Sequence, residues 1–238
     1  MRTFTTYAKA DPEAINLVDK LPTIQGNPTE YRSQMLAIGR HLGASVLGNL
    51  PSKNAKNICV VCTVEDADFL ARGVIEALEE QGLGEHVHLI CLWNEKIRAN
   101  GGSLSPITKQ YKEDFDAKDV TLIIVKSIIS GACVVKTNLT RVISFAQPKE
   151  IFVVSPVMYI GAEDRLAREF PKEISSKFKF VHFATDTEKD ADGENIRPGI
   201  GGSVYELLGL GNDHTKNKYM PAIVKQRRVK NFPEVATA

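Results

Sequence analysis

The sequence predicts an α/β protein in which helices flank a parallel sheet. Short apolar runs rich in β-branched residues are typical of buried strands, and they occur at residues 58–64, 87–93, 120–125, 151–155 and 178–183. Helical stretches are predicted between them at residues 66–81, 132–145 and 163–170. Because strands and helices alternate along the chain, we expect a parallel sheet with helices on both faces.

The clearest helix is predicted over residues 27–50. Asn27 can cap its first turn, Pro28 suits the first helical position, and Glu30 can reach back to a free backbone N–H. Apolar side chains then recur every three or four residues and form one stripe that must pack against the rest of the protein: Tyr31, Met35, Ile38, Leu42 and Val46.

Composition and charge narrow the class of protein. The chain has 238 residues, 43% of them hydrophobic, which is enough for a sizeable core in one domain or one domain with an appendage. A formal net charge of +1 gives no global field toward nucleic acid or membrane. No apolar run has the roughly 18 to 20 residues that cross a bilayer, and residues 1–9 lack a signal-peptide pattern. We therefore expect a soluble, intracellular protein without membrane contact.

Two segments interrupt the alternation of strands and helices. Residues 94–118 are polar and too long for a tight connection, so we expect a β-arm or a mobile loop there. The last segment, residues 213–238, reads as a basic tail added to a domain of residues 1–212. Its cations alternate with apolar residues, which favours docking on an acidic protein partner. A disordered terminus and a nucleic-acid contact are the alternatives.

A candidate phosphate site lies in residues 121–133, where a buried strand runs into a turn of small residues and then a helix. Free backbone N–H groups and the helix dipole both favour phosphate at such a turn. Ser130, Gly131 and Cys133 are the candidate phosphate-binding residues. A plain strand-to-helix connection is the alternative interpretation.

Three segments together resemble the uracil phosphoribosyltransferase family, which has the type I phosphoribosyltransferase fold. Residues 31–42 resemble the family's helix with an Ile-Gly-Arg-x-Leu pattern. Residues 121–133 resemble its strand and the following turn, which ends in Thr-Gly-Gly-Ser/Thr, and residues 195–202 resemble its base-binding stretch. The resemblance covers about residues 20–212. It implies a phosphoribosyltransferase-like parallel sheet flanked by helices, with a β-arm, a C-terminal extension and an oligomeric assembly.

The resemblance also implies a reaction, the transfer of ribose 5-phosphate from phosphoribosyl pyrophosphate to uracil, usually with magnesium. Such a donor needs cations on its pyrophosphate and a carboxylate on its ribose hydroxyls. This chain departs from the family's pattern at those positions. Val125, followed by Lys126, replaces the ribose-binding acid, Glu65 and Asp66 replace a pyrophosphate-binding arginine segment, and Asn94 and Gly202 replace two more charged residues.

Other parts of the family's pattern are retained. Ser130 and Gly131 keep part of the phosphate turn, and the base loop keeps its shape through Ile196, Pro198, Gly199 and Gly201, ending at Gly202. We therefore expect an impaired or inactive member that binds a nucleobase or nucleotide and serves as a binding, regulatory or assembly subunit, and we assign no catalytic residue and no metal ligand. The alternative is an active, magnesium-dependent enzyme whose donor site is rebuilt around Lys126 and Arg197.

Other polar residues have structural interpretations that are simpler than functional ones. Cys59 and Cys62 have the spacing of a metal or redox pair, but residues three apart in a strand point to opposite faces. His86 and His88 share a strand face, where surface positions are the simplest interpretation. The acidic residues at 186–194 are expected to form a solvated loop, with a hard cation as the alternative.

Overall fold

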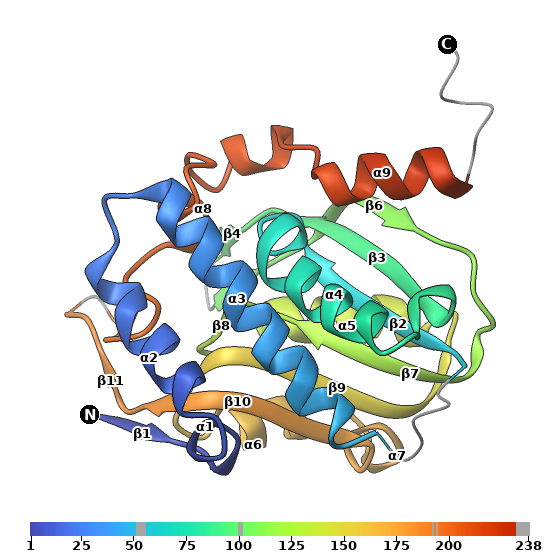
Figure 1. The fold of residues 1–238 in the computed structure, drawn as a ribbon, viewed down its shortest axis with the longest axis horizontal. Coiled ribbons are helices and arrows are strands. Elements are labelled where there is room, and N and C mark those ends of the chain that lie inside the picture. The colour runs from blue at the N-terminus through green and yellow to red at the C-terminus, as the bar shows by residue number, and fades with distance from the viewer. Residues whose placement is uncertain (51–55, 100–101, 192, 194, 232–238) are drawn as a thin grey trace.

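The computed structural model describes residues 1–50, 56–99, 102–191, 193 and 195–231 (Figure 1). Its centre is an eight-stranded sheet, and β8 (Ile128–Ile129) pairs with β9 beside the main path. Along that path the order is β1 (Arg2–Phe4), β10 (Phe178–Asp186), β9 (Gln147–Tyr159), β7 (Lys118–Val125), β2 (Ile58–Thr63), β3 (Val87–Asn94) and β6 (Ile107–Lys112).

The predicted parallel sheet is confirmed. Strands β10, β9, β7, β2 and β3 run parallel to one another, and β1 and β6 add antiparallel edges. Each predicted strand is present, although β9 extends well beyond residues 151–155 on both sides. The predicted boundaries were short there because Pro148, Lys149 and Glu150 interrupt the apolar pattern before the buried run begins.

Helices cover both faces of the sheet, as Figure 1 shows. One face carries α1 (Thr6–Lys9), α2 (Pro12–Lys20), α3 (Pro28–Leu47), α4 (Arg72–Glu80) and α9 (Ala222–Asn231), and the other carries α5 (Cys133–Ile143), α6 (Ala162–Arg168) and α7 (Lys172–Ser175). The two faces have separate apolar cores. Cys62 belongs to one core and Cys59 to the other, which confirms that their sulfurs face apart.

Helix α3 forms as the sequence predicts and packs closely on α4. The Asn27 side chain accepts a hydrogen bond from the Glu30 N–H at 3.2 Å, and the predicted apolar stripe is buried. The two helices touch through glycines, because a Cβ on Gly39 would lie 2.2 Å from the Leu70 carbonyl oxygen and one on Gly73 would lie 2.2 Å from that of Leu36. The glycine in the family-like Ile-Gly-Arg pattern is therefore required by helix packing.

The path of the chain creates a crevice at one edge of the sheet. From β2 the chain moves to β3 on one side and then crosses to β7 on the other side of β2. In an open α/β sheet, ligands bind at the carboxyl ends of the strands where the chain changes direction in this way. That position falls at residues 64–66, after β2, and at residues 126–127, after β7.

Shorter elements surround this edge. Residues 94–118 form a hairpin of β4 (Ile97–Ala99) and β5 (Gly102–Leu104), followed by β6, so the expectation of a β-arm is confirmed for the hairpin while β6 joins the main sheet. A second hairpin pairs β11 (Glu188–Lys189) with β12 (Ile196–Arg197). The remaining short helices are η1 (Leu21–Thr23), η2 (Ala67–Ala71), η3 (Gly84–His86), α8 (Val204–Leu207) and η4 (Thr215–Lys218). No helix in the described ranges has both the length and the apolarity that crossing a membrane requires.

The C-terminal segment packs against the domain, which corrects the expectation of a separate docking tail. Ile223 and Val224 of α9 are buried in the core. The Asp68 carboxylate, on η2, accepts hydrogen bonds from the Ala222 and Ile223 N–H groups at 2.7 Å each and so caps α9. The alternation of cations and apolar residues therefore reflects one buried side and one exposed side of the segment. A partner for the exposed cations stays a prediction.

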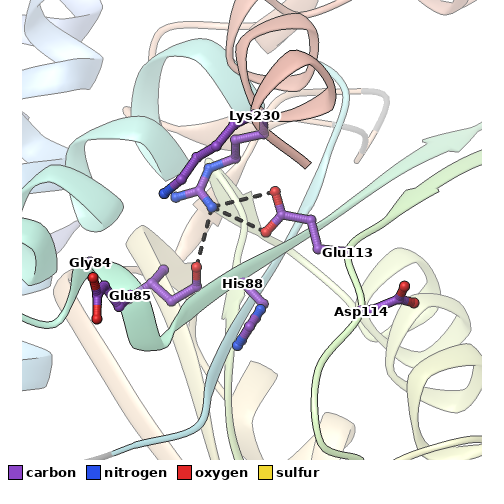
Figure 2. Close-up of a pocket in the computed structure, with 8 residues that line it drawn as sticks. Gly84, Glu85, His88, Glu113, Asp114 and Lys230 are labelled. Atoms are coloured by element: carbon purple, nitrogen blue, oxygen red, sulfur yellow. Dashed lines mark hydrogen bonds and ion pairs between the residues drawn. The ribbon is translucent and has the colours of Figure 1, made fainter. Parts of the chain in front are cut away.

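One cation of α9 is also held inside the molecule. The Arg227 guanidinium donates to both Glu113 oxygens, at 3.1 and 3.4 Å, and to the Val87 carbonyl at 3.2 Å. Figure 2 shows these contacts as dashed lines, with Glu113 turned toward α9 and His88 on the neighbouring strand. Because Glu113 directly follows β6 and is 3% exposed, this pair fastens α9 to the end of β6, and the Val87 contact fastens it to the start of β3.

Two substitutions in the same helix test this packing. Val224→Ala, at 1% exposure, is expected to lower the free energy of unfolding by about 2 kcal/mol, because two buried methyl groups are lost. Val229→Ala, at 55% exposure, is the matched control and is expected to change it by less than about 0.5 kcal/mol. The measurement is urea unfolding, and equal effects of the two variants would mean that α9 does not pack on the core.

Candidate functional site

A pocket opens at the carboxyl ends of β2, β3 and β7, in the crevice described above. Its volume is about 670 Å³. Four segments surround it: the ends of the strands, the turn into α5, the loop between residues 189 and 206, and the start of the C-terminal segment. The pocket brings together the sequence-predicted residues Glu65, Asn94, Lys126, Ser130, Gly131, Cys133 and Gly202.

The base of the pocket holds an ion cluster centred on Lys126. The Lys126 ammonium lies 2.9 Å from Asp66 Oδ2, 3.2 Å from Glu65 Oε1 and 3.1 Å from Ser127 Oγ. Lys126 directly follows β7, and the two acids follow β2. Since β2 and β7 are adjacent parallel strands, their carboxyl ends meet and place these side chains together.

A second lysine reaches the same cluster from the C-terminal segment. The Lys216 ammonium lies 3.0 Å from the Asn94 carbonyl oxygen, 3.5 Å from Glu65 Oε2 and 3.3 Å from Asp213 Oδ1. Lys216 is only 3% exposed. Sequence reasoning placed it among the cations of a free tail, and no local pattern distinguishes it from the exposed lysines nearby.

The buried carboxylates of the cluster are paired with buried lysines. Burial alone would raise the pKa of Glu65, but Lys126 and Lys216 outweigh it and bring that pKa to about 2. Burial alone would lower the pKa of Lys126, yet Asp66 and Glu65 hold it above its usual value. Glu65 and Asp66 each have a lysine partner, and Asp213 is a third carboxylate that pairs with Lys216. The expectation that Glu65 and Asp66 present uncompensated negative charge to a donor is therefore corrected.

Val125 and Asn94, two other positions expected to meet the donor, have buried side chains. Val125 is 1% exposed, belongs to the core and does not line the pocket. The Asn94 amide donates to Asn138 Oδ1 and to the Ser105 carbonyl, both at 2.9 Å. Asn94 is 3% exposed and its own Oδ1 has no hydrogen-bond partner in the described part of the chain. A buried acceptor of this kind favours a ligand that brings a donor.

The candidate phosphate turn lines the pocket and leads into a helix. Ser130, Gly131 and Cys133 line the pocket, and α5 begins at Cys133. The first turn of α5 has no acidic residue and no side-chain cap. Gly131 has open space around it, since a Cβ there would meet no atom within 4 Å. An uncapped helix start that faces a pocket is suited to an anion.

The base loop of residues 195–202 reaches the pocket at its two ends, Asn195 and Gly202. Gly202 and the following Ser203 line the pocket, whereas Ile196, Pro198, Gly199 and Gly201 do not. The loop packs on the domain instead, because the Tyr31 hydroxyl donates to the Ile200 carbonyl at 2.8 Å and the Gly199 N–H donates to Asp186 at 2.9 Å. The retained loop shape therefore serves internal packing at these positions.

Asp186 itself corrects one expectation. It was assigned to a solvated acidic loop, but it is fully buried and pairs with the Arg2 guanidinium at 2.8 Å. No local pattern indicates this pair, because Arg2 and Asp186 lie at opposite ends of the domain's sequence and meet through the pairing of β1 with β10.

The residues of the pocket do not fit a magnesium site. Among the described residues, no three histidine, cysteine, aspartate or glutamate side chains lie close enough to hold a metal ion together. The two carboxylates best placed for a metal, Glu65 and Asp66, are already paired with lysine.

Comparisons with known proteins support the fold alone. No family model matches the chain, and no curated protein is similar to it. The AQ2163 protein from Aquifex aeolicus matches with a TM-score of 0.65 and 14% identity over 84% of this chain and 96% of that one, which shows a shared fold. Two phosphoribosyltransferases match more weakly. The hypoxanthine phosphoribosyltransferase from Staphylococcus aureus has a TM-score of 0.36 and 14% identity, over 54% of this chain and 65% of that one. The hypoxanthine-guanine phosphoribosyltransferase from L. donovani has a TM-score of 0.42 and 12% identity, over 65% of this chain and 82% of that one.

Removal of one lysine tests the ion cluster. Lys126→Met keeps the length of the side chain but leaves Glu65 and Asp66 without their shared partner, so we expect a loss of about 3 to 5 kcal/mol in the free energy of unfolding. Lys136→Met is the control, because Lys136 forms an exposed pair with Glu169 and should lose less than about 1 kcal/mol. Urea unfolding at neutral pH measures both, and similar losses would contradict the central role of Lys126.

Proposed function

We propose that this protein has a phosphoribosyltransferase-like fold, binds a nucleoside monophosphate and transfers no phosphoribosyl group. One observation carries the proposal: Lys126 is buried between Glu65 and Asp66 at the position where the family resemblance puts the donor's pyrophosphate. The protein then acts as a binding or regulatory subunit, and a pyrimidine nucleotide is the first ligand to test because the resemblance is to a uracil-specific family.

The cluster opposes binding of phosphoribosyl pyrophosphate. A pyrophosphate needs cations that are free to pair with it. The two lysines at the base of the pocket are each held by carboxylates. Recruiting Lys126 would leave the buried Asp66 without its lysine and Glu65 with Lys216 alone, at a cost of about 3 to 5 kcal/mol. The alternative of an active enzyme rebuilt around Lys126 and Arg197 is disfavoured, since Arg197 is exposed and does not line the pocket.

The rest of the pocket favours a ligand with a single phosphate. The uncapped start of α5 supplies amide donors and a positive dipole end for one anion. The unpartnered Asn94 Oδ1 can accept from a ribose hydroxyl, and Ser203 Oγ, also without a partner among the described residues, can serve the other end of the ligand. A volume of about 670 Å³ is in the range of nucleotide-sized sites.

The first test is turnover. Incubation with uracil, phosphoribosyl pyrophosphate and magnesium is expected to give no UMP above background, measured by chromatography, because the two lysines at the base of the pocket are already paired with carboxylates. An active uracil phosphoribosyltransferase assayed in parallel is the positive control. A rate of about 1 per second or faster, which is ordinary for enzymes, would refute the proposal.

The second test separates phosphate binding from base binding. Gly131→Asp adds a negative charge at the phosphate turn, where there is room for a side chain, and should weaken UMP binding at least about tenfold while leaving uridine binding unchanged. Gly131→Asn is the matched neutral control and should retain UMP. Calorimetry measures these affinities. Equal UMP affinity in the two variants would place the phosphate elsewhere.

A further inference from the structure

One edge of the sheet is open. Strand β6 is the last strand of the main sheet and pairs only with β3. Within the described residues, no backbone hydrogen bond joins residues 107–110 or Lys112 to a segment other than β3. The outward N–H and C=O groups of β6 are therefore available to a further strand.

A groove runs along this edge, between β6 and α9. It has a volume of about 500 Å³ and is lined by four consecutive strand residues, Lys109 to Lys112, together with Trp93, Met220, Val224 and Arg228. Successive strand residues point to opposite faces of a sheet. All four line the same groove because it follows the strand's edge rather than one face.

The charge of the groove has one sign. Lys109, Lys112 and Arg228 line it, and no carboxylate does. On the other face of β6, Arg141 of α5 donates to Gln110 Oε1 at 3.0 Å and adds a fourth cation beside the strand. Two acids lie beside the groove: Asp114, which is almost fully exposed and 3.9 Å from Lys112, and Glu113, which accepts from the Tyr111 hydroxyl at 3.0 Å and is paired with Arg227.

We propose that the β6 edge binds an acidic segment of a partner protein, which adds in extended conformation as a new strand. The open backbone supplies main-chain hydrogen bonds. Acidic side chains on one face of the added strand meet Lys109 and Arg228, and those on the other face meet Lys112 and Arg141. Adjacent residues of a strand point to opposite faces. Cations on both faces of this edge therefore match a strand that has acidic residues at adjacent positions.

Other occupants fit the edge less well. A second copy paired through β6 would bring Lys109 and Lys112 against their own copies, which like charge opposes. Single-stranded nucleic acid would need exposed aromatic rings for stacking, whereas Trp93 is 2% exposed and donates to the Tyr219 carbonyl. Lysines on an edge strand also discourage aggregation, a role that requires no ligand. The experiment below separates these cases.

The test uses the full chain and an acetylated eight-residue peptide in which pairs of glutamates alternate with pairs of valines, so that glutamates lie on both faces of the extended strand. Trp93 is the only tryptophan of the protein and lies against the groove, so its fluorescence reports binding. We expect saturable binding in about 0.05 M salt that weakens about tenfold or more in about 0.5 M salt. Lys109→Glu with Arg228→Glu should abolish binding, and Lys149→Glu with Lys172→Glu, which makes the same charge change at exposed sites elsewhere, should not.

A second peptide decides whether a strand is added. The same sequence with alternate backbone nitrogens methylated keeps its charge but cannot pair with β6, and it should lose binding. Equal binding of the methylated peptide would show only charge attraction and overturn the proposal. It would also be overturned by the absence of binding, by oligothymidylate binding that is lost in the Lys109→Glu, Arg228→Glu variant, or by self-association that this variant abolishes. None of these outcomes depends on the nucleotide pocket.

Discussion

The pairing of Lys126 with Asp66 and Glu65 is the interaction on which the rest of the site depends. It joins the carboxyl ends of β2 and β7 at the point where the sheet changes direction, and Lys216 extends it to the C-terminal segment. Charges buried this deeply are stable only when all their partners are present. The cluster therefore sets both the shape of the pocket's base and the position of the chain that closes one side of it.

This arrangement gives the two ends of the pocket different chemistry. The charged groups at the base are already paired with one another, whereas the start of α5 has amide donors and no acid of its own. The C-terminal segment belongs to the same design, since Lys216 completes the cluster and Asp68 caps α9. A segment that looks like an appendage in the sequence is thus part of the domain and of the site.

The features that could be predicted from the sequence are those that depend on local patterns of residues. Buried β-branched runs indicated the parallel strands, and spacing and capping indicated α3. Small residues after β7 indicated a turn into a helix, which is present before α5, while phosphate binding there stays a prediction. The sequence did not predict contacts set by the fold: Lys216 meets Glu65 across 151 positions, and Arg2 meets Asp186 across 184. A lysine in a basic run looks the same whether it is solvated or buried. Likewise, Gly199 and Gly201 are explained equally well by a ligand or by internal packing until their neighbours are known.

The most direct test of this account compares two ligands on the unmodified protein by calorimetry: UMP, and phosphoribosyl pyrophosphate with magnesium. The first carries one phosphate and suits the start of α5, while the second needs cations that the cluster already holds. The account predicts that UMP binds at least about tenfold more tightly, a difference of about 1.4 kcal/mol or more. Tighter binding of phosphoribosyl pyrophosphate, with heat that depends on magnesium, would contradict it.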